Sequence, residues 1–128
     1  MTELSHYTVL TWVRAYEDAW RSGDIDAVAR LFTEDVRYRR SPYEPAEVGH
    51  DAVRAFWAED AGHVFTVEAH PVAVEGPVAV VRLLVRYTAP EQQEYSDLWL
   101  LRFAADGRVA DFEEWAYWPG RGYTAGAD

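Results

Sequence analysis

Four polar side chains occupy positions that the surrounding pattern predicts to be buried, and they are the candidates for chemistry. Tyr16 lies on the apolar side of a predicted helix, and Arg40 ends the first predicted strand. Asp97 shares a strand face with Trp99, and Glu114 lies on the inward face of the last strand. A buried carboxylate is costly unless it is paired or its pKa is displaced. We therefore expect Asp97 or Glu114 to act as an acid or base, while Tyr16 and Arg40 stabilise negative charge on a ligand oxygen.

The same four residues have a structural interpretation that the sequence leaves open. Arg40 can pair with Glu114 or Asp97 and hold the core together, because structural ion pairs also perturb titration. Tyr16 can be a core tyrosine whose hydroxyl has one hydrogen-bond partner. In that case the chain is a non-catalytic binding or dimerisation module.

Other kinds of site find little support. The chain has no cysteine, which excludes disulfides, thiolate catalysis and cysteine-based metal sites. Its four histidines share no ligand-like spacing, so no metal site is expected. The sequence Gly120-Arg121-Gly122 is not followed by a helix, unlike a dinucleotide-binding loop. We expect no metal and no cofactor.

Aromatic residues are abundant, with six tryptophans and eight tyrosines in 128 residues. A domain of this size cannot easily bury so many rings in a compact core, so some are expected to line a pocket for a small apolar metabolite. The predicted wall consists of Trp12, Trp20, Tyr38, Trp57, Phe65, Trp99, Phe112 and Trp118.

The formal charge is −10, which disfavours phosphate backbones and anionic lipid as partners. No segment approaches the ~20 apolar residues of a membrane span, and no secretory leader is recognisable. We expect a cytoplasmic protein that binds a small molecule, and neither nucleic acid nor membrane.

Hydrophobic periodicity predicts helices first and strands afterwards. A helix is expected over 7–22, because Val9, Trp12, Val13, Tyr16 and Trp20 form one stripe at helical spacing. Further helices are expected over 25–33 and 51–60, and strands over 36–40, 63–75, 78–88, 94–104 and 108–118.

This order predicts an α+β domain over 1–118, in which a bent antiparallel sheet forms a cone around the first helix, followed by a flexible tail over 119–128. Pro71 is expected to break or bulge its strand. The last strand is apolar on both sides, with Trp115 and Tyr117 facing outward. We therefore expect a homodimer that packs through the outer sheet face.

Three segments resemble the nuclear transport factor 2-like superfamily, and within it the SnoaL-like proteins and ketosteroid isomerases. They are YEDAWRSGDIDAVARLFTEDV, HDAVRAFW after Gly49, and LRFAADGRVADFEEW. The resemblance implies a cone-shaped α+β fold, a pocket between the first helix and the curved sheet, and frequent dimers.

The resemblance also implies what some positions do. Tyr16 falls where ketosteroid isomerases keep the tyrosine that donates to the oxyanion. Arg40 and Trp99 stand where those enzymes have their two aspartates, so proton transfer in the isomerase arrangement is not expected. Limonene-type epoxide hydrolases use an Arg-x-Asp pair and a further Asp; the counterparts here are Arg82-Leu83-Leu84 and Ala116.

Overall fold

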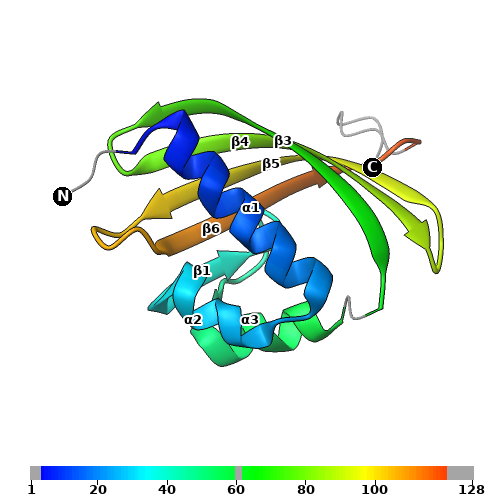
Figure 1. The fold of residues 1–128 in the computed structure, drawn as a ribbon, viewed down its shortest axis with the longest axis horizontal. Helices are drawn as coiled ribbons and strands as arrows, with labels where there is room; N and C mark the ends of the chain where they lie inside the picture. Colours follow the sequence, from blue (N-terminus) through cyan, green and yellow to red (C-terminus); the bar gives the residue numbers. More distant parts are fainter. Residues whose placement is uncertain (1–3, 60–61, 121–128) are drawn as a thin grey trace.

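The computed structural model describes residues 4–59 and 62–120. Within these residues, three α-helices and one 3₁₀ turn are combined with six strands, which confirms the predicted α+β class. Figure 1 shows their arrangement. In chain order the elements are α1 (His6–Ser22), the 3₁₀ turn η1 (Ile25–Ala27), α2 (Val28–Leu31), β1 (Phe32–Arg39), β2 (Glu47–Val48), α3 (His50–Ala58), β3 (Val64–Glu75), β4 (Val78–Ala89), β5 (Gln93–Phe103) and β6 (Val109–Tyr117).

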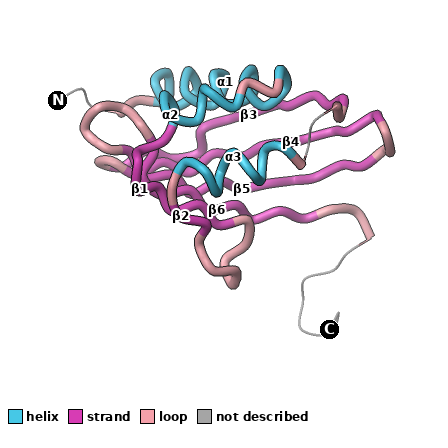
Figure 2. Tube along the Cα trace, turned by 90° about the horizontal axis from the view of Figure 1, so that it is seen from below, coloured by secondary structure: helices cyan, strands magenta, loops and turns pink. Residues whose placement is uncertain are grey.

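The six strands form one sheet in the order β2-β1-β6-β5-β4-β3. The sheet is mixed rather than wholly antiparallel, because β1 pairs in parallel with β6 while the other neighbours are antiparallel. The three helices lie on one side of the sheet (Figure 2). The polar side chains on the inner face of the sheet are therefore enclosed between the sheet and the helices.

Helix α1 has well-defined ends. Ser5 accepts a hydrogen bond from the Thr8 backbone N–H, and the Thr8 hydroxyl accepts one from the Ser5 N–H, so two otherwise unpaired donors are satisfied. Gly23 ends the helix with φ of 69°, a left-handed conformation that glycine adopts without strain. Between these ends the predicted stripe is buried, and it brings Tyr16 to the sheet.

The predicted second helix over 25–33 is shorter than expected. It consists of η1 and α2 and ends at Leu31, while Phe32 and Thr33 already belong to β1. Phe32 is extended, fully buried and paired with Val109 of β6. The local helical pattern continues through Phe32, but sheet pairing with a residue 77 positions away in the chain determines its conformation.

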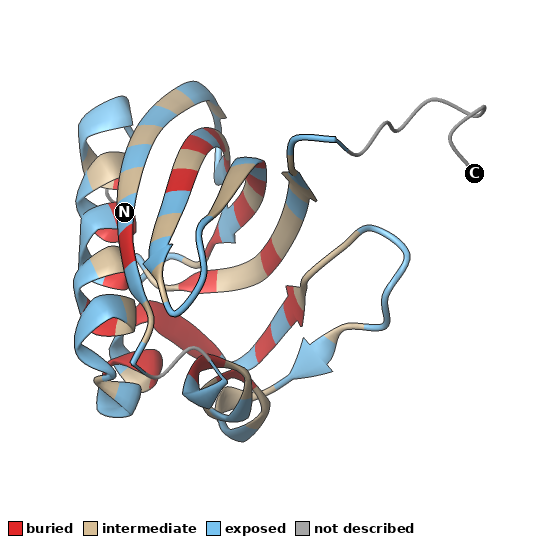
Figure 3. Cartoon of the chain, turned by 90° about the vertical axis from the view of Figure 1, so that its right-hand side faces the viewer, coloured by how far each residue is buried: buried red, intermediate tan, exposed pale blue. Residues whose placement is uncertain are grey.

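The sheet has the expected alternation, with buried bands separated by exposed ones along the strands (Figure 3). Its inner face carries Ala79, Val81, Leu83 and Val85 of β4 and the alternate residues of β5. The bulge predicted near Pro71 is present, since the register shifts between Pro71 and Ala73. This curved inner face is the floor against which α1 packs.

Two predictions concern residues that the structure does not describe. They are the end of the third helix at Asp60 and most of the tail over 119–128. Among the helices of the described residues, none combines the length and apolar character needed to cross a bilayer.

Candidate functional site

A cavity of about 430 Å³ lies between α1, α3 and the inner face of the sheet. It contains all four predicted polar candidates and five of the eight predicted aromatic ones. Its lining residues are Tyr16, Trp20, Tyr38, Arg40, Phe56, Trp57, Val85, Tyr87, Tyr95, Asp97, Trp99, Glu114, Ala116 and Trp118. The volume falls within the usual range for small-molecule sites.

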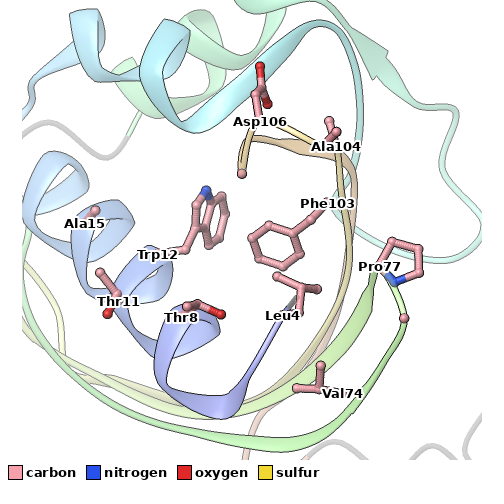
Figure 4. Close-up of a pocket in the computed structure, with 13 residues that line it drawn as sticks. Leu4, Thr8, Thr11, Trp12, Ala15, Val74, Pro77, Phe103, Ala104 and Asp106 are labelled. Carbon is pink, nitrogen blue, oxygen red and sulfur yellow. The ribbon is translucent and has the colours of Figure 1, made fainter. Parts of the chain in front are cut away.

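The three remaining aromatic candidates lie elsewhere. Trp12 lines a second cavity, of about 790 Å³, near the start of α1, where it lies beside Phe103 (Figure 4). Its indole N–H donates to the Leu31 carbonyl at 3.0 Å. Phe65 and Phe112 do not line the first cavity but contact two residues that do, Trp20 and Tyr38 respectively. The sequence stripe could not distinguish the two ends of α1, because residues one or two turns apart point in nearly the same direction.

Two carboxyl groups lie side by side on the cavity floor. Asp97 of β5 is opposite Ala116 of β6, and Glu114 is opposite Trp99, so all four share one face of the antiparallel pair. The Asp97 and Glu114 side chains hydrogen-bond each other, and Glu114 Oε2 accepts from Trp99 Nε1 at 2.9 Å. Two carboxyl groups can form a hydrogen bond only if one of them is protonated.

Asp97 holds that proton. Its side chain is 5% exposed, and its Oδ1 has no hydrogen-bond partner. Burial, the charge of Glu114 and the hydrogen bond with Glu114 raise the pKa of Asp97 to about 9. Each of these causes disfavours a second negative charge beside the first. At neutral pH the pair therefore contains one neutral acid that can donate a proton.

Two tyrosine hydroxyls meet on another side of the cavity. Tyr16 Oη and Tyr38 Oη are 2.6 Å apart, so one hydroxyl donates to the other. Burial first, and then Tyr16 and Glu114, raise the pKa of Tyr38 well above its usual value, although the nearby Trp57 indole offsets part of the increase. The hydroxyl of Tyr38 stays neutral at physiological pH. A neutral hydroxyl of this kind can donate a hydrogen bond but supplies no base.

Arg40 contacts groups of α3 and of the residue that follows this helix. Its guanidinium lies over the Phe56 ring, 4.5 Å from the centroid, and 3.8 Å from Glu59 at the surface. The strand ends at Arg39, one residue earlier, so Arg40 turns toward α3. It is a cation at the edge of the cavity.

Sequence reasoning did not select five lining residues: Phe56, Val85, Tyr87, Tyr95 and Ala116. All except Phe56 lie on β4, β5 and β6, on the face that lines the cavity. Tyr87 and Tyr95 make an edge-to-face contact on neighbouring strands. Their adjacency depends on the register of β4 with β5, which a single sequence does not specify.

The polar side chains of the cavity are suited to proton transfer. No group of three or more His, Asp or Glu side chains that could hold a metal is present in the part of the chain that the structure describes. The cavity instead offers one protonated carboxyl, one neighbouring carboxyl, two hydroxyls and a wall of rings. Such a site can bind an apolar molecule and exchange protons with two neighbouring atoms of it.

Comparisons with known proteins agree with this fold. The model of the SnoaL-like domain family matches residues 13–112. None of the curated proteins matches the sequence closely enough to count as a relative.

Three solved structures are similar to this chain. An LEH-like epoxide hydrolase from M. tuberculosis has 16% identity and a TM-score of 0.70, with 88% of this chain and 84% of that chain covered. The epoxide hydrolase/cyclase-like enzyme SalBIII has 19% identity and a TM-score of 0.68, covering 86% and 89%. An NTF2-like protein of unknown function from Burkholderia pseudomallei K96243 has 23% identity and a TM-score of 0.70, covering 88% and 91%.

At these identities the structural neighbours establish the NTF2-like fold and nothing about the reaction. The family match covers most of the chain and includes both Tyr16 and Asp97. On that match, this chain belongs to the SnoaL-like domain family.

Proposed function

We propose that the 430 Å³ cavity is the active site of a cofactor-independent enzyme that moves protons on a small apolar metabolite. Asp97 is the acid and Glu114 the base, while Tyr16 and Arg40 stabilise negative charge on a substrate oxygen. The observation that carries this proposal is the buried Asp97 carboxyl, paired with Glu114 on neighbouring strands within an aromatic wall.

The pair can complete a catalytic cycle without another reagent. Asp97 donates its proton to a substrate oxygen, and Glu114 removes a proton from a neighbouring C–H or O–H. The proton then lies on Glu114 and returns to Asp97 through the hydrogen bond between the two carboxyls. The enzyme ends as it began, and the substrate has been isomerised, cyclised or opened.

Opening of an epoxide or a related strained ether is one reaction that fits this scheme. Two of the structural neighbours are an LEH-like epoxide hydrolase and an epoxide hydrolase/cyclase-like enzyme. The present pair lies on β5 and β6 and is not the Arg-x-Asp arrangement named above. Similarity of fold therefore supports the substrate class only as an analogy.

A thermal-shift screen against a metabolite library tests whether the cavity binds such a molecule. We expect neutral ring compounds with an acceptor oxygen to raise the melting temperature, since a ligand that binds only the folded state stabilises it. Ala116→Trp, which places a large side chain in the cavity lining, should abolish the shift. A hit that stabilises both proteins equally, or a library without hits, would contradict the proposed site.

The non-catalytic alternative is tested with the ligands that the thermal-shift screen identifies. In that case the carboxyl pair is purely structural, and Glu114→Gln leaves both ligand binding and any turnover unchanged. The contacts of Arg40 with Glu59 and Phe56 favour a position at the cavity edge over the ion-paired form of this alternative.

We also propose that two copies of the chain associate through the outer sheet face. Leu98 is directly opposite Trp115, and both are more than a third exposed, as is Tyr117 further along β6. Contiguous apolar surface of this kind favours a partner.

Sedimentation velocity should give the mass of a dimer for the wild type and that of a monomer for Leu98→Glu, because an unpaired charge cannot be buried between two sheets. Tyr43→Glu is the matched control: Tyr43 is 98% exposed in a loop, and this variant should remain dimeric. A monomeric wild type would refute the proposed interface.

A further inference from the structure

The hydrogen bond between Trp99 and Glu114 distinguishes the two carboxyls of the pair. Trp99 is 2% exposed and lies directly across the ladder from Glu114, and its Nε1 donates to Oε2 at 2.9 Å. An indole N–H can only donate, so this contact favours a charged carboxylate over a neutral carboxyl. Asp97 Oδ1 has no corresponding donor.

Other charged and titratable groups line the same cavity. From α1 and β1, Tyr16 and Tyr38 face the cavity and bond each other. Tyr87 and Tyr95 line it from β4 and β5 as further hydroxyls, and Arg40 lies at the rim beside Glu59 of α3's C-terminal end.

Burial is the competing explanation. Asp97 is buried and Glu114 is half-buried, so desolvation alone also favours the proton on Asp97. The two causes can be separated, because removing the indole N–H eliminates one of them and leaves the depth of Asp97 unchanged.

We infer that Trp99 is a positioning residue that assigns the base role to Glu114 and the acid role to Asp97. Its N–H keeps the negative charge on Glu114 and fixes the orientation of that carboxylate. The assignment of roles rests on the proposed function, but the position of the proton does not require any substrate and can be measured in the free protein.

The chain provides a matched control in Trp57. This second buried tryptophan lines the same cavity, but its Nε1 does not donate to Glu114, and its indole instead acts on the Tyr38 hydroxyl. Trp99→Phe and Trp57→Phe therefore remove the same atoms from the same cavity, and only Trp99→Phe removes a donor from Glu114. Loss of packing is common to the two variants.

The experiment is a pH titration of ¹³C-carboxyl-labelled Asp and Glu side chains by NMR in the wild type and both variants. A charge-assisted hydrogen bond is strong enough that its loss should lower the ratio of protonated Asp97 to protonated Glu114 about tenfold in Trp99→Phe. Trp57→Phe should keep the wild-type ratio.

A second substitution guards against misfolding of Trp99→Phe. Benzothienylalanine at position 99 keeps the two-ring shape and replaces the N–H with sulfur, so it should move the proton as Trp99→Phe does. Unchanged Asp97 and Glu114 curves in this variant, or equal changes in Trp57→Phe, would overturn the inference and leave burial as the cause. Either result leaves the proposed function standing, because that proposal is tested separately by ligand binding and turnover.

Discussion

Asp97→Asn should make the protein more stable at alkaline pH, although it replaces an ionisable carboxyl group in the core with an amide. Between the ordinary pKa of 3.8 and about 9, folded Asp97 keeps a proton that the unfolded chain releases. The unfolded state therefore binds fewer protons, and the wild type loses up to about 1.4 kcal/mol of unfolding free energy per pH unit across this window. Asparagine has no such proton and can still donate to Glu114.

Urea denaturation at pH values from 4.5 to 9 measures this effect. We expect similar stabilities for wild type and Asp97→Asn at pH 4.5, and a difference on the order of 3 to 5 kcal/mol in favour of the variant at pH 8. The repulsion that accompanies a net charge of −10 affects both proteins, so their difference isolates Asp97. Asp18→Asn, an exposed position on α1, should follow the wild type at every pH. A pH-independent difference between wild type and Asp97→Asn would show that Asp97 is not protonated in the folded state.

Glu114→Gln should lower turnover of a substrate found by the screen by about 10²- to 10⁴-fold, the usual contribution of a positioned acid or base. Glutamine keeps the shape and can accept from Trp99, but it cannot remove a proton. Asp97→Asn should lower turnover by a similar factor. The double variant should have only slightly lower turnover than either single variant, because the two carboxyls act as one unit.

Glu113→Gln is the control for this measurement. Glu113 is adjacent in the chain but lies on the opposite face of β6, where it contacts Arg39 and the Trp115 indole. It should retain turnover within about twofold, as surface substitutions usually do. Equal turnover in Glu114→Gln and wild type would eliminate Glu114 as the base.

Much of the fold was accessible from sequence because its signals are local. The stripe on α1, the left-handed stop at Gly23 and the alternation along β4 to β6 each concern neighbours in the chain. The same alternation placed Asp97 and Glu114 on inward faces, and the structure shows that they are adjacent. What failed was the second helix, because Phe32 is held in β1 by pairing with Val109.

The details of the site depended on information that one sequence does not contain. Whether Arg40 faces Glu114 or Glu59 is decided by where β1 ends and how the chain turns toward α3. The Tyr16–Tyr38 contact requires the packing angle of α1 on the sheet. Hydrophobic periodicity correctly indicated which face of a helix or strand a residue occupies. It did not indicate where along that element the cavity lies, so Trp12 was assigned to the wrong cavity.

The parallel pairing of β1 with β6 has a consequence for biosynthesis. Of the six strands in the described residues, β6 is the last to leave the ribosome, yet it lies between β1 and β5 in the sheet and carries Glu114. Until it emerges, β1 lacks its main neighbour and the inner face of β5 has no Glu114 opposite Trp99. Strand pairing over such sequence separation is slow, and unpaired strand edges are prone to association with other chains. The nascent chain therefore exposes its aromatic interior until β6 has emerged, and the cavity cannot be complete before then.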